Sequence, residues 1–267
     1  MKALPPFALL LFVLALSRPA PALEILLPGV AVEEDFDGLA SAGTANTGLP
    51  AGWSFLETGT GANATYAAGA GSSSTGNVYS FGATGSADRA LGTLRSASVA
   101  ASFGTPLVNR TGGTIGGLAL SYWGEQWRLG AAGRVDRLDF AYSLDSTGLA
   151  GGTWIEVDEL DFTAPVTVAA SGALNGNDPV NRSHVTLGLR GLHLLPNARL
   201  WLRWSDFDAS GADDGLGIDD FAVVAIADAA VADSWPAEAP GAVASGLLLI
   251  ALAIVLQRFT CGRMAAM

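Results

Sequence analysis

Cysteine is almost absent from this 267-residue sequence, which contains only Cys261. One cysteine cannot form a disulfide within a chain, so a folded domain here must be stabilised by packing alone. The two histidines, His184 and His193, have no cysteine or carboxylate partners at zinc-site spacing. A nucleophile elbow, a P-loop and a dinucleotide-binding fingerprint are missing as well. No common enzyme class is therefore indicated.

Charged residues are also scarce, at 15% of the chain, and they are mainly acidic. The net charge of −11 would repel phosphate backbones, so nucleic acid is excluded as an expected partner. Glycine is abundant, with 34 residues. This composition is typical of an extracellular β domain and favours cations, sugars or other surface polymers as partners.

The N-terminus has the three parts of an export signal. Lys2 supplies the positive charge, residues 7–16 form an apolar stretch too short to span a bilayer, and Ala20-Pro21-Ala22 is an A-x-A cleavage site. We therefore predict a signal peptide at residues 1–22, removed by signal peptidase.

The C-terminus contains a second apolar segment, residues 242–257, followed by Arg258 and Arg263. Apolar character around the whole circumference and trailing arginines predict a transmembrane helix with a short cytoplasmic tail at 258–267. Residues 227–241, which are small, acidic and proline-containing, are predicted to form a stalk.

The order of these C-terminal parts resembles the PEP-CTERM tails of Gram-negative bacteria. The motif residues are Pro236, Glu238 and Pro240, and the apolar segment and the arginines follow them. The resemblance implies recognition by an exosortase-type membrane enzyme. It leaves open whether the tail is cleaved or stays as an anchor at the cell surface.

Between the two ends, residues 23–226 show a period of two and no long helical period. In residues 135–144, Leu138, Phe140 and Tyr142 lie on one face and alternate with mainly polar residues. In the same way Leu200, Leu202 and Trp204 alternate with Trp201, Arg203 and Ser205. Further strands are predicted at 77–81, 96–103, 117–123, 154–157, 166–170, 185–189 and 218–226, and residues 59–76 are predicted to form a surface loop. We therefore predict an all-β fold, a two-sheet antiparallel jelly-roll sandwich.

Several motifs of this middle part are similar to those of MAM-like, choice-of-anchor jelly-roll domains of bacterial surfaces. They are Phe36-Asp37-Gly38, the segment 48–53 that ends in Trp53, and the segment 213–221. Residues 124–128 and 137–143 also resemble the β domain that precedes some extracellular nucleases and PEP-CTERM proteins. The resemblance implies a jelly roll with an unknown or adhesive role, and it carries over no nuclease activity.

The densest polar feature is an acidic cluster near the end of the domain. Asp206, Asp208 and Ser210-Gly211 have the oxygen spacing of the first half of a calcium loop, although Gly217 stands where a bidentate glutamate is expected. A structural calcium site is one interpretation, and Asp35 or Asp37 would join it if the first and last strands are adjacent. Turn-forming, solvated aspartates are the other. The candidate metal ligands are Asp206, Asp208, Asp213, Asp214, Asp219 and Asp220.

Two further sets of residues suggest contacts with sugars. Glu125, Trp127 and Arg128 combine an aromatic ring with charged groups and form a candidate carbohydrate site; the alternative is a structural Glu–Arg pair with Trp127 in the core. Glu156, Asp158 and Asp161 resemble the catalytic strand of jelly-roll β-glucanases, which implies a retaining glycoside hydrolase. The alternative is the polar face of an exposed strand.

Taken together, the sequence favours a non-catalytic, exported surface or matrix protein that binds glycan or a neighbouring surface polymer. A jelly-roll glycoside hydrolase and a purely structural surface protein are the other two hypotheses.

Overall fold

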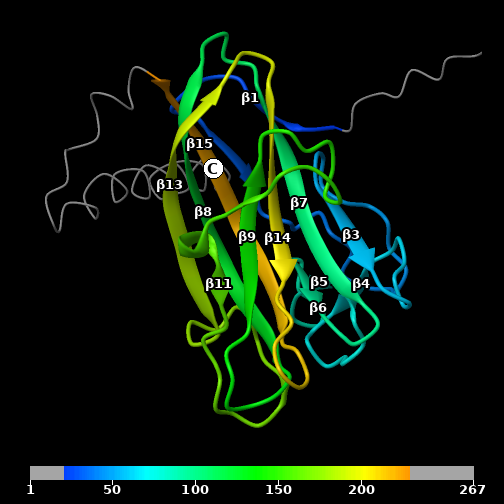
Figure 1. The fold of residues 1–267 in the computed structure, drawn as a ribbon. Helices are drawn as coiled ribbons and strands as arrows, with labels where there is room; N and C mark the ends of the chain where they lie inside the picture. Colours follow the sequence, from blue (N-terminus) through cyan, green and yellow to red (C-terminus); the bar gives the residue numbers. More distant parts are fainter. Residues whose placement is uncertain (1–20, 229–267) are drawn as a thin grey trace, which may run out of the picture.

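The computed structural model describes residues 21–228, which form a sandwich of two β-sheets (Figure 1). The predicted all-β, two-sheet fold is confirmed. Within residues 21–227 the only helix is a short 3-10 turn, η1 (Asp158–Leu160). The predicted transmembrane helix and sorting motif, and nearly all of the predicted signal peptide, lie outside the described residues.

The first sheet, sheet A, has seven strands, and β7 (Ala100–Asn109) and β14 (Arg199–Asp206) form its centre. The strand order is β1-β7-β14-β9-β10, with β11 also paired to β9 and β3 to β7. The remaining strands are β1 (Leu23–Ile25), β3 (Ser54–Thr58), β9 (Arg137–Ser143), β10 (Ile155–Glu156) and β11 (Phe162–Thr163).

The second sheet, sheet B, has eight strands built around the long strands β8 (Ile115–Leu129) and β15 (Gly215–Ala227). The order is β12-β8-β15-β6-β5-β4, with β13 also paired to β8 and β2 to β15. The others are β2 (Ala31–Glu34), β4 (Ala67–Gly69), β5 (Asn77–Phe81), β6 (Ala90–Leu94), β12 (Gly172–Ala173) and β13 (Arg182–Leu194).

Three details differ from the sequence predictions. The pairs β1–β7 and β4–β5 are parallel, although the sequence predicts an antiparallel arrangement. Residues 59–76, predicted to be a loop, contain β4. Residues 166–170 are not a strand, because the backbone of Val166 pairs with the Gln126 side-chain amide (2.8 and 2.9 Å) instead of a neighbouring strand.

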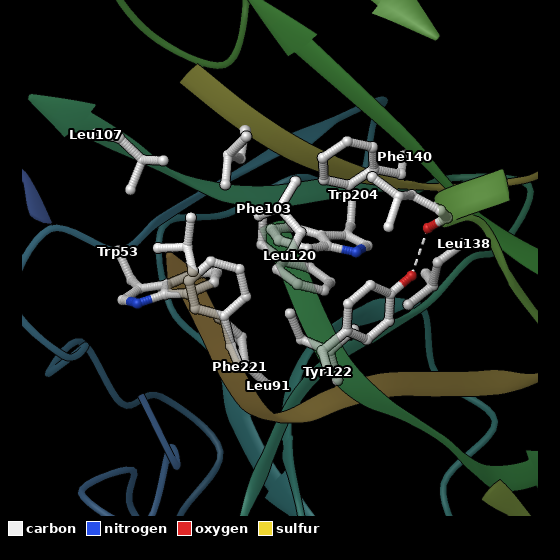
Figure 2. Close-up of a cluster of buried hydrophobic side chains, with 14 of the residues drawn as sticks. Trp53, Leu91, Phe103, Leu107, Leu120, Tyr122, Leu138, Phe140, Trp204 and Phe221 are labelled. Atoms are coloured by element: carbon white, nitrogen blue, oxygen red, sulfur yellow. Dashed lines mark hydrogen bonds between the residues drawn. The ribbon is translucent and has the colours of Figure 1, made fainter. Parts of the chain in front are cut away.

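The core lies between the sheets and is centred on Trp204, whose side chain is fully buried (Figure 2). Its indole contacts aromatic rings from both sheets and from the loop after β2, at centroid distances of 5.1–5.8 Å. The partners are Trp53, Phe103, Tyr122, Phe140 and Phe221. Tyr122 also donates a hydrogen bond to the Leu160 carbonyl, which ties η1 to the core.

Candidate functional site

The predicted sugar-binding residues lie on the outer face of sheet B, but two of the three are covered. Trp127 is 1% exposed, stacks on Phe81 with ring centroids 6.1 Å apart, and donates a hydrogen bond to Glu125 Oε2 (2.9 Å). Glu125 is fully buried, and Arg128 donates to the Gly71 carbonyl (3.2 Å). No face of Trp127 is therefore open to a sugar ring. The predicted alternative was half right, because Trp127 is buried but Glu125 pairs with its indole and not with Arg128.

Trp123, four residues earlier on β8, has the exposure that Trp127 lacks. Tyr122 points into the core, so the alternation of the strand turns Trp123 outward, and it is only half-buried. The register places His184 of β13 and Asp219 of β15 directly opposite it. The His184 ring lies 5.2 Å from the Trp123 ring, and the Arg182 guanidinium lies 4.6 Å from its centroid. The outward indole thus contacts a cation and an imidazole, both from β13.

The polar groups beside Trp123 have shifted ionisation. Burial raises the pKa of Asp219 to about 9, and the charges of Glu125 and Asp220 contribute to the rise. Burial also raises the pKa of Glu125 to about 7, and lowers the pKa of His184. At neutral pH Asp219 is therefore protonated and His184 is uncharged. Groups in these states both donate and accept hydrogen bonds, which suits hydroxyl-bearing, uncharged ligands.

The six aspartates of the predicted calcium site do not meet at one point. Asp214 accepts hydrogen bonds from the Gly130 amide (2.7 Å) and from Gln126, and Asp213 accepts one from the Ala209 amide (3.0 Å). Asp208, whose side chain is 73% exposed, pairs with Arg95 (3.1 Å). Among residues 21–228, no group of three or more His, Cys, Asp or Glu side chains is arranged to hold a metal ion.

Asp206 differs from the rest of this cluster because it points into the core from the end of β14. It is 5% exposed, and neither of its carboxyl oxygens has a hydrogen-bond partner. The Thr93 hydroxyl, also buried, faces it from β6 and lowers its pKa. Burial raises the pKa of Asp206 well above its ordinary value, and Asp136 and Asp213 raise it further, whereas Arg95 lowers it. Burial thus favours the protonated form of Asp206 in the described conformation.

We expect Asp206→Asn to stabilise the domain at neutral pH by about 1–3 kcal/mol. In the unfolded chain an aspartate loses its proton above pH ~4, whereas folded Asp206 keeps it. The stability contributed by Asp206 is therefore complete below that pH and is lost as the pH rises towards its raised, folded-state pKa. An amide cannot ionise and can donate to Thr93.

Urea unfolding at pH 4 and pH 7.5 tests this expectation. The advantage of the variant should grow with pH, and Asp208→Asn, at an exposed site, serves as the control. If the free energy of unfolding differed between Asp206→Asn and wild type by the same amount at both pH values, the pKa of Asp206 would not be raised in the folded protein.

The calcium hypothesis supposed that the first and last strands are adjacent; β1 lies in sheet A, but β2, the first strand of sheet B, is adjacent to the last strand. β2 pairs with β15, with Glu34 opposite Phe221. This pairing brings the loop after β2 close to Asp220: burial raises the pKa of Asp37, and the charges of Asp35, Asp88 and Asp220 add to the rise. Asp37 Oδ1 accepts a hydrogen bond from the Arg89 amide (3.1 Å). Negative charge is therefore concentrated beside the middle of β15, around Asp220.

The three acids of the predicted glycosidase strand do not share a strand face. Glu156 lies on the two-residue strand β10, Asp158 begins η1, and Asp161 caps its C-terminal end. Asp161 Oδ1 accepts a hydrogen bond from the Phe140 amide (2.7 Å), and Arg137 lies 3.6 Å from its other oxygen. The 3-10 turn breaks the alternation on which the prediction depended, so the predicted catalytic geometry is wrong.

The predicted sorting residues Pro236, Glu238 and Pro240 lie outside the described residues, as does the apolar segment 242–257. Within residues 21–228, no helix has the length and apolar character needed to cross a bilayer.

No protein-family model matches the chain, and no curated protein matches it in sequence. Among solved structures, it is similar to the K1 cleaved adhesin domain of Lys-gingipain from Porphyromonas gingivalis W83, with 13% identity, 74% of this chain and 99% of that chain covered, and a TM-score of 0.44. The K3 domain of Lys-gingipain matches with 12% identity, 72% and 98% coverage and a TM-score of 0.42. TmCBM61, solved with β-1,4-galactotriose, matches with 12% identity, 64% and 88% coverage and a TM-score of 0.33. Because these TM-scores are below 0.5, the similarities carry no conclusion about ligand or activity.

Proposed function

We propose that this protein is a non-catalytic, exported surface or matrix protein whose β-sandwich binds a neutral glycan on the outer face of sheet B. The single observation that supports the proposal is the half-buried Trp123, which faces outward with Arg182 and His184 against its ring. Sugar rings present apolar C–H faces that pack on an indole, and their hydroxyls need adaptable donors and acceptors at the rim. Exposed His184 supplies such a group beside the ring, whereas Asp219 is itself buried.

Export and sorting complete this proposal. The signal peptide at residues 1–22 would direct the chain out of the cytoplasm, and the PEP-CTERM-like tail with Pro236, Glu238 and Pro240 would bring it to an exosortase-like enzyme. The apolar segment 242–257 would hold the protein in the membrane until it is processed or for good. The binding face would then meet extracellular polysaccharide at the cell surface.

A glycan array probed with the full chain tests the proposal. We expect retention on at least one class of uncharged oligosaccharide, with the signal lost in Trp123→Ala. His193→Ala is the matched control, because His193 lies on β13 with a side chain that is 71% exposed. No retention on any glycan, or equal retention by Trp123→Ala, would favour a purely structural surface protein.

We also propose that calcium binds beside the middle of β15, where Asp35, Asp37, Asp88 and Asp220 concentrate negative charge. Burial and the repulsion among these carboxylates raise the pKa of Asp37, and a divalent cation would relieve the repulsion. The carboxylates would have to turn towards one another, since in the described conformation of residues 21–228 no three of them are placed to hold an ion.

Calcium should therefore stabilise the protein, by about 2.7 kcal/mol at a concentration a hundred times its Kd. Thermal unfolding of the full chain in calcium and in chelator measures this shift. Asp37→Asn should reduce it and Asp208→Asn should not. An identical melting temperature in calcium and chelator would rule the site out.

A further inference from the structure

A second arginine–tryptophan pair lies on the outer face of sheet A. Leu202 and Trp204 point into the core, so Arg203 between them points outward. Its guanidinium carbon lies 3.9 Å from the centroid of the Trp154 ring, and Trp154 immediately precedes β10. The indole is half-buried, and its Nε1 donates to the Gly151 carbonyl (2.8 Å), which fixes its orientation.

The N–H groups of Arg203 make only long contacts with other groups of the protein, and one of its nitrogens has no partner. Its Nη1 reaches the Leu149 carbonyl at 3.4 Å, its Nη2 lies 3.8 Å from Glu156 Oε1, and its buried Nε has no partner. The Glu156 side chain is 58% exposed, so this long ion pair is weak. Burial lowers the pKa of Arg203 and Glu156 raises it, and an arginine remains a cation in either case. Arg203 is a partly desolvated positive charge whose nearest anion is held at long range.

Other arginines of the domain lie closer to carboxylates than Arg203 does. Arg134 lies 3.0 Å from Asp136 and 3.1 Å from Asp214, and Arg137 Nε lies 2.5 Å from Asp139. Arg203 differs from them although the protein carries a net charge of −11. Anionic groups are plentiful in the chain, but among residues 21–228 none is placed closely against the fork of this guanidinium.

The Arg203 side chain is 19% exposed, and the residues beside it in the sheet are small. In the sheet register its neighbours are Ala141 on β9 and Gly104 on β7, and Ser54 of β3 lies beyond Gly104. These residues have side chains too short to cover a guanidinium. Ile155, next to Trp154, is 44% exposed and extends the apolar surface beside the indole.

We propose that Trp154 and Arg203 form a second carbohydrate site, which binds a sugar bearing a carboxylate, such as a uronic acid. The ring of the sugar would pack on Trp154, and its carboxylate would accept two hydrogen bonds from the Nη groups of Arg203 in place of Glu156. This site lies on the opposite sheet from Trp123, so it does not depend on the proposed neutral-glycan site and would not compete with it.

Calorimetric titration of the full chain with tri-galacturonate, and with its uncharged methyl ester, tests the inference. We expect the acid to bind at least about tenfold more tightly than the ester, because the ester cannot form a charge-assisted bidentate pair. Trp154→Ala and Arg203→Lys should each weaken binding of the acid by about tenfold or more. Trp123→Ala should leave it unchanged, which separates this site from the proposed neutral-glycan site.

Glu156→Gln is expected to bind more tightly than wild type, a result that unfolding of the variant could not produce. Removing the competing carboxylate should tighten binding of tri-galacturonate several-fold and leave the ester unaffected. Equal affinity for acid and ester, no binding of the acid, or weaker binding by Glu156→Gln would each overturn the inference. The melting temperature of every variant is measured beside wild type, so that a loss of binding in a folded variant is distinguished from unfolding.

Discussion

Trp204→Ala is expected to lower the free energy of unfolding by about 3–5 kcal/mol. Trp204 is fully buried, and its ring contacts five aromatic side chains that come from both sheets and the loop after β2. Removing the indole would open a cavity where the two sheets meet, and the stiff surrounding strands cannot collapse to fill it. With total stabilities of about 5–15 kcal/mol, such a loss leaves many domains barely folded.

Urea unfolding followed by circular dichroism measures this loss. Trp204→Phe should recover part of the stability because a smaller cavity remains. Trp154→Ala, at a half-buried position on the outer face, is the control and should cost much less. A loss below about 1 kcal/mol for Trp204→Ala would mean that the sheets are not held together at this point.

Trp123→Ala is expected to weaken binding of a neutral oligosaccharide by about thirtyfold, which corresponds to about 2 kcal/mol. The indole provides the large apolar surface that Arg182, His184 and Asp219 surround, and alanine would remove it while leaving those polar groups in place. Since Trp123 is half-buried and faces away from the main core, the fold should survive the change.

Calorimetric titration of the oligosaccharide selected on the array gives this ratio. His193→Ala, on the same strand as His184 but at its other end, should bind like wild type. Unchanged affinity in Trp123→Ala, with the fold intact, would place the ligand elsewhere or show that there is none.

Alternation along single strands predicted the core of this domain well. Leu200, Leu202 and Trp204 were expected to share a face, and all three are fully buried between the sheets. The same period of two continues to Asp206, which therefore points inward as well. Its spacing from Asp208 indicated a metal loop instead. The strand pattern was the stronger signal, because backbone alternation determines the face of the sheet on which a side chain lies, whatever the charge of that side chain.

The candidate site was harder to predict than the core. Alternation predicts the face of the sheet on which a side chain lies, but it does not predict which other segments cover that face. Trp123 and Trp127 both point outward from β8, yet only Trp127 is covered. Part of its cover is Gly176, where any side chain would collide with the Trp127 indole. Contacts between segments this far apart in sequence leave no local pattern, so the sequence could not show that Trp127 is covered.

The acidic residues illustrate the same limit. Neighbours in sequence, such as Asp206 and Asp208, separate into a buried and an exposed position, whereas Asp37 and Asp220 come together through the β2–β15 pairing. The first strand, β1, pairs with β7 in sheet A, and it is the second strand, β2, that pairs with the last strand and brings Asp37 near Asp220. Asp158 begins η1, a turn that the strand pattern did not indicate, and so leaves the strand that carries Glu156.

NMR of the indole N–H groups tests most directly whether a glycan contacts the outward indole of Trp123. The protein is labelled with ¹⁵N-tryptophan, and the Trp123 resonance is identified by its loss in Trp123→Ala. Addition of the array-selected neutral oligosaccharide should shift this resonance and leave that of the core residue Trp204 in place. A titration that saturates binding without moving the Trp123 resonance would contradict the account.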